Sequence, residues 1–191
     1  MARLKLRLFI LSVCAIVATV LSNGTLAYYS VTGTATNVVT SGNIMLAIHE
    51  TQEDTTPYPE DPVIVLPGQR VSKRVTVENV CAHPFYLRVK LVNSIDNTAI
   101  SADGCFDIDI NDTAWTQRED GYLYYNEVLY PGETTEPVFN EVKIIGDKVD
   151  NSYIGSVLSL TVNAYAVQQE NNPAEHPWDA AGWPYDEGGG Q

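Results

Sequence analysis

Residues 157–168 read VLSLTVNAYAVQ, the longest run in the chain in which apolar side chains recur at every second position. Side chains two residues apart lie on the same face of an extended strand, so this run can bury one face and expose the other. The residues that share its apolar face are Leu158, Leu160, Val162, Ala164 and Ala166. Further runs with the same period lie at 44–48, 71–77, 85–91 and 106–110.

Short turn signals separate these runs, and no window has a sustained helical period. The turn signals are Pro67-Gly68, Ala82-His83-Pro84, Asp103-Gly104, Asp120-Gly121, Pro131-Gly132 and Gly146-Asp147. Many short strands at this spacing predict an all-β domain over residues 43–168, an antiparallel two-sheet sandwich of jelly-roll or Greek-key type. Residues 53–62 contain three prolines and four acidic residues, which favours an exposed loop.

The composition excludes several classes of protein. The 191 residues include 24 Asp and Glu against 11 Lys and Arg, for a net charge of −13, yet 45% are hydrophobic. That hydrophobic fraction is too high for a disordered acidic tail, and the negative charge disfavours nucleic acid as a partner. No pattern in the sequence indicates a cofactor.

The N-terminus has the layout of a secretory signal peptide. Arg3, Lys5 and Arg7 precede an apolar run over 8–21, which is short for a membrane span of about 20 residues. The run ends in small residues, which predicts a signal over 1–27 with cleavage between Ala27 and Tyr28. We expect a secreted protein that contacts the membrane only through the uncleaved signal; an uncleaved anchor is the alternative.

Several blocks of sequence follow one another along the chain: GTLAYYS at 24–30, ATNVVTSGNI at 35–44, LPGQR at 66–70 leading to VTVEN at 75–79, FYLRVK at 85–90, GYLYYN at 121–126, VLYPGETT at 128–135 and VNAYAVQ at 162–168. In this order and spacing they resemble the TasA/camelysin (CalY) family of secreted proteins of Gram-positive bacteria. The resemblance implies processing by a SipW-type signal peptidase. It also implies a jelly-roll subunit of extracellular biofilm-matrix fibres, assembled head to tail from copies of itself, with other matrix proteins as further candidate partners. The expected location is the extracellular matrix or the cell surface.

In such fibres the N-terminal segment of one subunit fills a strand position in its neighbour, and residues 28–42 are the candidate donor. The segment Tyr28 to Val39 has no charged residue and alternates Tyr, Val and Thr with small residues, as an added strand requires. The donor residues are Tyr28, Tyr29, Val31, Ala35, Val38 and Val39. The alternative is that this segment is the first strand of its own monomer.

Two other functions fit parts of the sequence. A monomeric cell-surface adhesion or binding module could use a face formed by Tyr122, Tyr124, Tyr125 and Tyr130, although tyrosine is also a common half-buried strand residue. The resemblance to camelysin also implies a further alternative function, that of a secreted metalloprotease. His49-Glu50 begins an HExxH motif, but position 53 is Glu, and His83 and His176 lie far away in sequence. We therefore expect no enzymatic activity.

Three acidic residues, Asp107, Asp109 and Asp112, form a weak candidate for calcium. Asp107, Asp109 and Asn111 alternate with Phe106, Ile108 and Ile110, which favours the wet face of a strand instead, so that no metal is expected.

Cys81 and Cys105 are the only cysteines that follow the signal. They form a candidate disulfide between neighbouring strand ends, with two buried free thiols as the alternative. The remaining segment, 169–191, is rich in Pro, Gly and acidic residues and predicts a flexible tail that carries Trp178 and Trp183.

Overall fold

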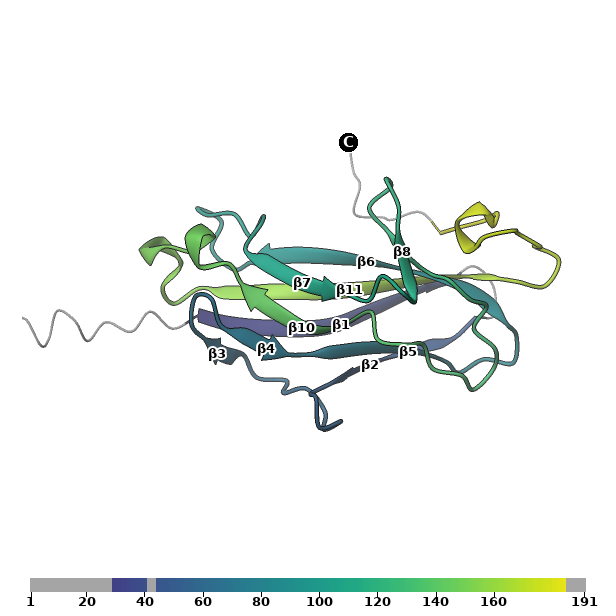
Figure 1. Ribbon diagram of the computed structural model, residues 1–191, viewed down its shortest axis with the longest axis horizontal. Helices are drawn as coiled ribbons and strands as arrows, with labels where there is room; N and C mark the ends of the chain where they lie inside the picture. The colour runs from purple at the N-terminus through teal and green to yellow at the C-terminus, as the bar shows by residue number, and fades with distance from the viewer. Residues whose placement is uncertain (1–28, 41–43, 185–191) are drawn as a thin grey trace, which may run out of the picture.

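The chain folds into two packed layers of β-strands in the computed structural model, which describes residues 29–40 as backbone and residues 44–184 with their side chains (Figure 1). The first layer is a six-stranded sheet in the order β3-β1-β11-β6-β9-β8. Its strands are β3 (Val63–Val65), β1 (Tyr29–Thr40), β11 (Val157–Gln168), β6 (Phe85–Ile95), β9 (Leu123–Tyr125) and β8 (Trp115–Gln117). All neighbours in this sheet run antiparallel except β1 and β11, which are parallel.

The second layer combines a three-stranded sheet with a two-stranded sheet. The order β4-β10-β7 joins β4 (Arg70–Ser72), β10 (Phe139–Ile144) and β7 (Phe106–Ile110), and β2 (Leu46–Thr51) pairs with β5 (Arg74–Asn79). The segment before β10 connects the two sheets. Thr135 N donates to Val77 O at 2.9 Å and Val138 N donates to Val75 O at 2.8 Å. Three 3-10 turns, η1 (Gly146–Lys148), η2 (Asn151–Tyr153) and η3 (Pro177–Asp179), complete the elements.

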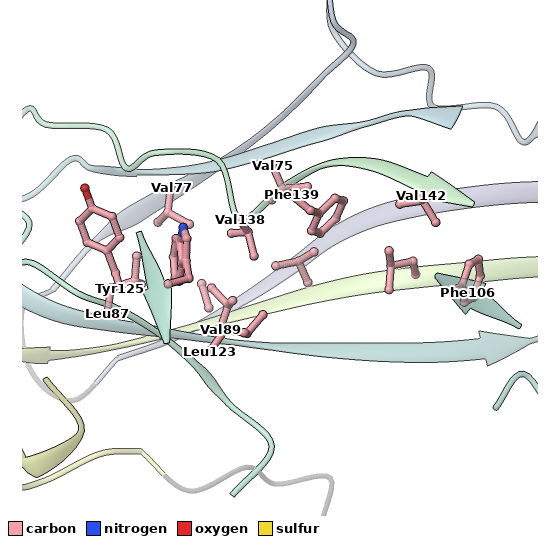
Figure 2. Packing of buried hydrophobic residues seen from close by; sticks show 14 of the residues in the cluster. Val75, Val77, Leu87, Val89, Phe106, Leu123, Tyr125, Val138, Phe139 and Val142 are labelled. Carbon is pink, nitrogen blue, oxygen red and sulfur yellow. The ribbon is translucent and has the colours of Figure 1, made fainter. Parts of the chain in front are cut away.

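Alternating apolar residues from both layers fill the interior, as Figure 2 shows. In β11 the inward residues are buried and their neighbours are partly exposed up to Asn163, which is the period that the sequence shows. Trp115 and Tyr125 close one end of the core with ring centroids 5.1 Å apart. The prediction of an all-β sandwich is confirmed; the parallel β1–β11 pair is the one departure from antiparallel pairing in this sheet.

The proline-rich segment 53–62 forms turns around an isolated bridge between Thr51 and Pro57 and is mostly exposed, as its prolines predict. Tyr58 is the exception, because its side chain is buried. In the part of the chain that the structure describes, no helix is long and apolar enough to cross a membrane.

The candidate disulfide is not formed, and both thiols are free and buried. Cys81 precedes β6 and donates its thiol hydrogen to His83 O at 3.2 Å. Cys105 follows the far end of β6, where its carbonyl accepts from Ile145 N at 2.9 Å. An 11-residue strand is about 35 Å long. The cysteines therefore lie near opposite ends of the sandwich, whereas a disulfide needs Cα atoms within about 7 Å.

Candidate functional site

The candidate donor segment lies inside the sheet of its own chain. Strand β1 runs parallel to β11, from the pair Ser30–Val157 to the pair Thr40–Ala166, with a register shift between Ala35 and Val38. On its other side β1 pairs with β3 only over Tyr29 to Val31. Figure 1 shows β1 in purple beside the light green β11. The segment is therefore extended, as its composition predicts, and its partners belong to the same chain.

The place that β1 occupies, between β3 and β11, is here called the β1 slot. Beyond Val31 the backbone of β1 pairs with no further strand on the side away from β11, among the residues described. The position of β1 in the sheet therefore depends mainly on its pairing with β11. Tyr28, Ala27 and the rest of the predicted signal over 1–27 lie outside the described residues.

A second site lies on the outer face of the six-stranded sheet. Here the guanidinium of Arg88 lies 3.7 Å from the ring centroid of Tyr122 and 4.8 Å from that of Trp183. Its Nη1 donates to the Tyr124 hydroxyl at 3.1 Å, and its Nη2 donates to the carbonyl of Pro184 at 2.8 Å. We call this group, completed by Tyr165 and Trp178, the outer cluster.

The outer cluster fastens the C-terminal segment to the sheet. Trp178 and Trp183 pack edge-on against Tyr124, with centroids 6.3 and 5.5 Å away. Ala174 N donates to the Tyr86 hydroxyl at 3.3 Å, and Asn172 pairs with the backbone of Ala181. Residues 169–184, for which a flexible tail is expected, thus lie against β6 and β9, and residues 185–191 lie outside the described part.

A groove of ≈ 560 Å³ opens beside the outer cluster, lined by Gln117, Arg118, Glu119, Asp120, Tyr124, Trp178 and Asp179. The Tyr124 hydroxyl donates to Asp120 Oδ2 at 2.7 Å, and the Arg118 guanidinium lies 4.9 Å from the Trp178 ring. Burial raises the pKa of Tyr124, because its ionised form would lose water contacts. Polar side chains around aromatic rings suit a small polar ligand.

The four tyrosines considered for a binding face separate in the structure. Tyr122 and Tyr124 belong to the outer cluster, whereas Tyr125 points into the core against Trp115. Tyr130 lies in a turn and is 55% exposed. They do not form one surface, because Tyr124 and Tyr125 are neighbours in β9 and therefore point to opposite faces.

Among the three calcium candidates, Asp109 is engaged by the backbone. Its Oδ1 accepts from Asn140 N at 3.0 Å and from Glu141 N at 2.6 Å, at the point where the β7–β10 register shifts. Asp107 and Asp112 are exposed. Within 29–40 and 44–184, no group of three or more His, Cys, Asp or Glu side chains is placed to hold a metal.

The histidines likewise lie in separate places. His49 Nε2 is 2.8 Å from Glu78 Oε2 on the exposed surface, and His83 Nδ1 is 3.4 Å from Glu170 Oε2. His176 stacks on Trp178 with ring centroids 4.5 Å apart. The residues that begin the HExxH-like motif, His49 and Glu50, occupy a strand rather than the helix on which that motif acts.

Two buried cations were not singled out from the sequence. Arg88 lies on the face of β6 that alternation assigns to water, and its burial comes from the covering segment 169–184 together with Tyr122 and Tyr124. Lys73, by contrast, has a sequence signal: it shares the parity of Val75 and Val77, whose face is buried. A lysine in the apolar register of a strand is the pattern that would have identified it.

No protein-family model, no curated protein and no solved structure matches this chain. Its function is therefore inferred from its residues and their geometry.

Proposed function

We propose that this chain is a secreted structural subunit of extracellular matrix fibres, assembled by exchange of β1 between copies. One observation carries the proposal: an uncharged N-terminal strand enters the six-stranded sheet in parallel with β11, with only residues 41–45 between it and β2. The resemblance of blocks over most of residues 24–168 to TasA/camelysin proteins supports the same function. It also supports a SipW-type peptidase as the processing partner and other matrix proteins as further partners.

Exchange keeps every backbone partner that β1 has in the single chain. The β1 slot of a second copy offers the same β3 and β11 registers, so the strand pairing of β1 is unchanged. If each copy donates to the next without receiving from the same partner, the contact does not close and a filament grows. The free edge of β1 beyond Val31 lets the strand enter or leave laterally.

The monomer, in which β1 occupies the β1 slot of its own chain, competes with the filament. An attached strand faces its own slot at an effective concentration in the millimolar range, so dilute protein favours the monomer. Retention of the segment by an uncleaved signal would prevent closure until cleavage, and high local concentration would then favour exchange. Assembly is therefore expected to depend on concentration and on processing at Ala27.

Paired cysteines can distinguish the two states. Thr34 and Thr161 are opposite each other in the β1–β11 register, and neighbouring strands lie about 4.8 Å apart, within reach of a disulfide. Chains carrying only Thr34→Cys are mixed with chains carrying only Thr161→Cys at high concentration and oxidised. Exchange predicts covalent heterodimers between the two variants on non-reducing gels, together with filaments in electron micrographs.

The matched control replaces Thr161→Cys with Ser152→Cys, which is exposed and outside the register of β1. The control mixture should give no heterodimers. The double variant Thr34→Cys/Thr161→Cys, oxidised while dilute, should be locked as a monomer and form filaments only after reduction. Heterodimers at the control level, with no filaments at any concentration, would reject the proposal.

A monomeric cell-surface binding module is the second candidate, favoured by the closed pairing of β1 and by the groove beside Trp178. It predicts a monomer at every concentration. It also predicts that an immobilised oligosaccharide array binds the wild-type protein and loses the signal in Asp120→Ala, with Glu141→Ala on the opposite layer as the control.

A further inference from the structure

Three polar groups are buried together where β2 meets the junction between β4 and β5. Lys73 is 1% exposed, and its Nζ lies 2.9 Å from Oε1 of Glu50 and 4.8 Å from the ring centroid of Tyr58. Tyr58 N donates to the carbonyl of Glu50 at 2.9 Å, which fixes the two residues beside each other. These residues are here called the Lys73 triad.

The triad is isolated from other polar partners. Among the described residues, Lys73 Nζ and Glu50 Oε1 have no directed hydrogen bond besides their close approach, and the Tyr58 hydroxyl has none. Removing two charges from water is costly unless further hydrogen bonds satisfy them. An ion pair is therefore a poorly stabilised state for these two side chains.

Burial favours the uncharged forms that react. It lowers the pKa of Lys73, an effect that the nearby Glu50 partly opposes, and so increases the fraction of neutral amine. Burial, reinforced by the charge of Glu50, raises the pKa of Tyr58 to about 12, so its hydroxyl keeps its proton at neutral pH. A neutral amine is a nucleophile.

We propose that Lys73 and Glu50 condense into an intramolecular amide bond that covalently joins β2 to the β4–β5 junction. A proton first passes from Nζ to Oε1 across their 2.9 Å contact, which leaves a neutral amine beside a neutral carboxyl group. The lone pair of Nζ then attacks Cδ of Glu50, and the new C–N bond forms as the C–O bond breaks. One remaining nitrogen-bound proton passes to the leaving hydroxyl group. One water molecule leaves, and no oxidant or other reactant is consumed.

The bond would replace a buried charge pair by a neutral amide. It would also pin β2, whose described pairing is with β5 alone, to the strand segment that follows β4. This inference does not rest on the proposed function, because the triad lies in the second layer, away from the β1 slot.

The test is peptide mapping by mass spectrometry of the purified, folded protein, incubated for days at neutral pH before denaturation and tryptic digestion. The expected product is a branched peptide that contains both Lys73 and Glu50, lighter by one water than its two parts, with fragment ions that assign the link to these side chains. Recovery of the two peptides only as separate, unmodified species after incubation would overturn the inference.

Variants identify the roles within the triad. Lys73→Met and Glu50→Ala should abolish the branched peptide. Glu141→Ala, which removes the carboxylate of the exposed Arg70 pair (3.0 Å), is the matched control and should form the link at the wild-type rate. Because the wild-type peptide map decides the bond itself, a variant that fails to fold leaves the test intact.

Discussion

Arg88 shows how a residue can be assigned to the correct face of a strand and still be wrongly expected to be exposed. The period-two pattern of 85–91 places Tyr86, Arg88 and Lys90 on the face away from the core, which is correct. That face is nevertheless covered, because residues 169–184 return across it and Arg88 donates to the carbonyl of Pro184. Alternation identifies the two faces of a strand, but only tertiary contacts decide whether the second face is wet.

Replacing Arg88 should release the C-terminal segment. Arg88→Met keeps the aliphatic stem but removes the hydrogen bonds to Tyr124 and Pro184 and the contact with the Tyr122 ring. We expect the free energy of unfolding to fall by about 2 kcal/mol, because a charge-assisted hydrogen bond and a partly buried cation–π contact each contribute about 1–2 kcal/mol. Urea denaturation measures the change, and limited proteolysis should now cleave within 169–184.

The control is Arg70→Met, which breaks an exposed ion pair with Glu141. An exposed pair contributes under about 1 kcal/mol, so protease resistance of the segment should be unchanged. Equal effects of the two substitutions would show that Arg88 does not hold the segment.

The raised pKa of Tyr58 predicts that the free energy of unfolding falls at alkaline pH. Its pKa is 10.0 without the fold and about 12 within it, so between these values the unfolded chain has lost a proton that the folded chain keeps. Stability from this group is complete below pH 10.0 and is lost as the pH rises toward about 12. The Tyr58→Phe variant should therefore lose less stability than wild type between these pH values, measured by urea denaturation, whereas Tyr130→Phe, on an exposed ring, should match wild type.

At the scale of elements, long strands with uninterrupted alternation were predictable and short or irregular ones were not. The run 106–110 coincides with β7, and 85–91 and 158–166 lie within β6 and β11. Strand β10 was missed because its register shifts between Phe139 and Val142, which breaks the period of two. The three-residue strands β3, β8 and β9 are too short to show a period at all.

Removal of β1 tests the element that the proposed function depends on. A chain that begins at Asn43 leaves β3 and β11 without their shared neighbour, and each lost backbone hydrogen bond contributes about 1 kcal/mol. We expect stability to fall by several kcal/mol and filaments to be absent in electron micrographs. Adding a peptide of residues 28–42 should restore the thermal midpoint. Filaments from the shortened chain alone would contradict assembly through β1.

At the scale of the whole molecule, the sequence predicts the sandwich but does not predict which distant segments lie next to each other. The cysteines were expected near each other because each lies at a strand end, yet β6 separates them along its full length. The alternation of apolar residues is a local pattern, whereas the pairing of distant strands leaves no local pattern in the sequence. The β1 slot could not be predicted for the same reason, since its walls come from residues 63–65 and 157–168.

The cysteine arrangement predicts that redox conditions do not change the folded chain. After removal of residues 1–27, the denatured protein should contain two titratable thiols, Cys81 and Cys105, with or without prior reductant. The urea midpoint should also be the same in both conditions, whereas a disulfide would add about 3 kcal/mol. Loss of both thiols in the oxidised sample would contradict the separation of Cys81 and Cys105 in the folded chain.

The parallel partnership of β1 and β11 has a consequence for biosynthesis. Strand β1 precedes β11 by more than a hundred residues, so the middle of the six-stranded sheet cannot close until synthesis has passed β11. Contacts of such long sequence separation form slowly. The proposed secretion would benefit from this delay, because a chain that folds late stays loose enough to pass through an export channel.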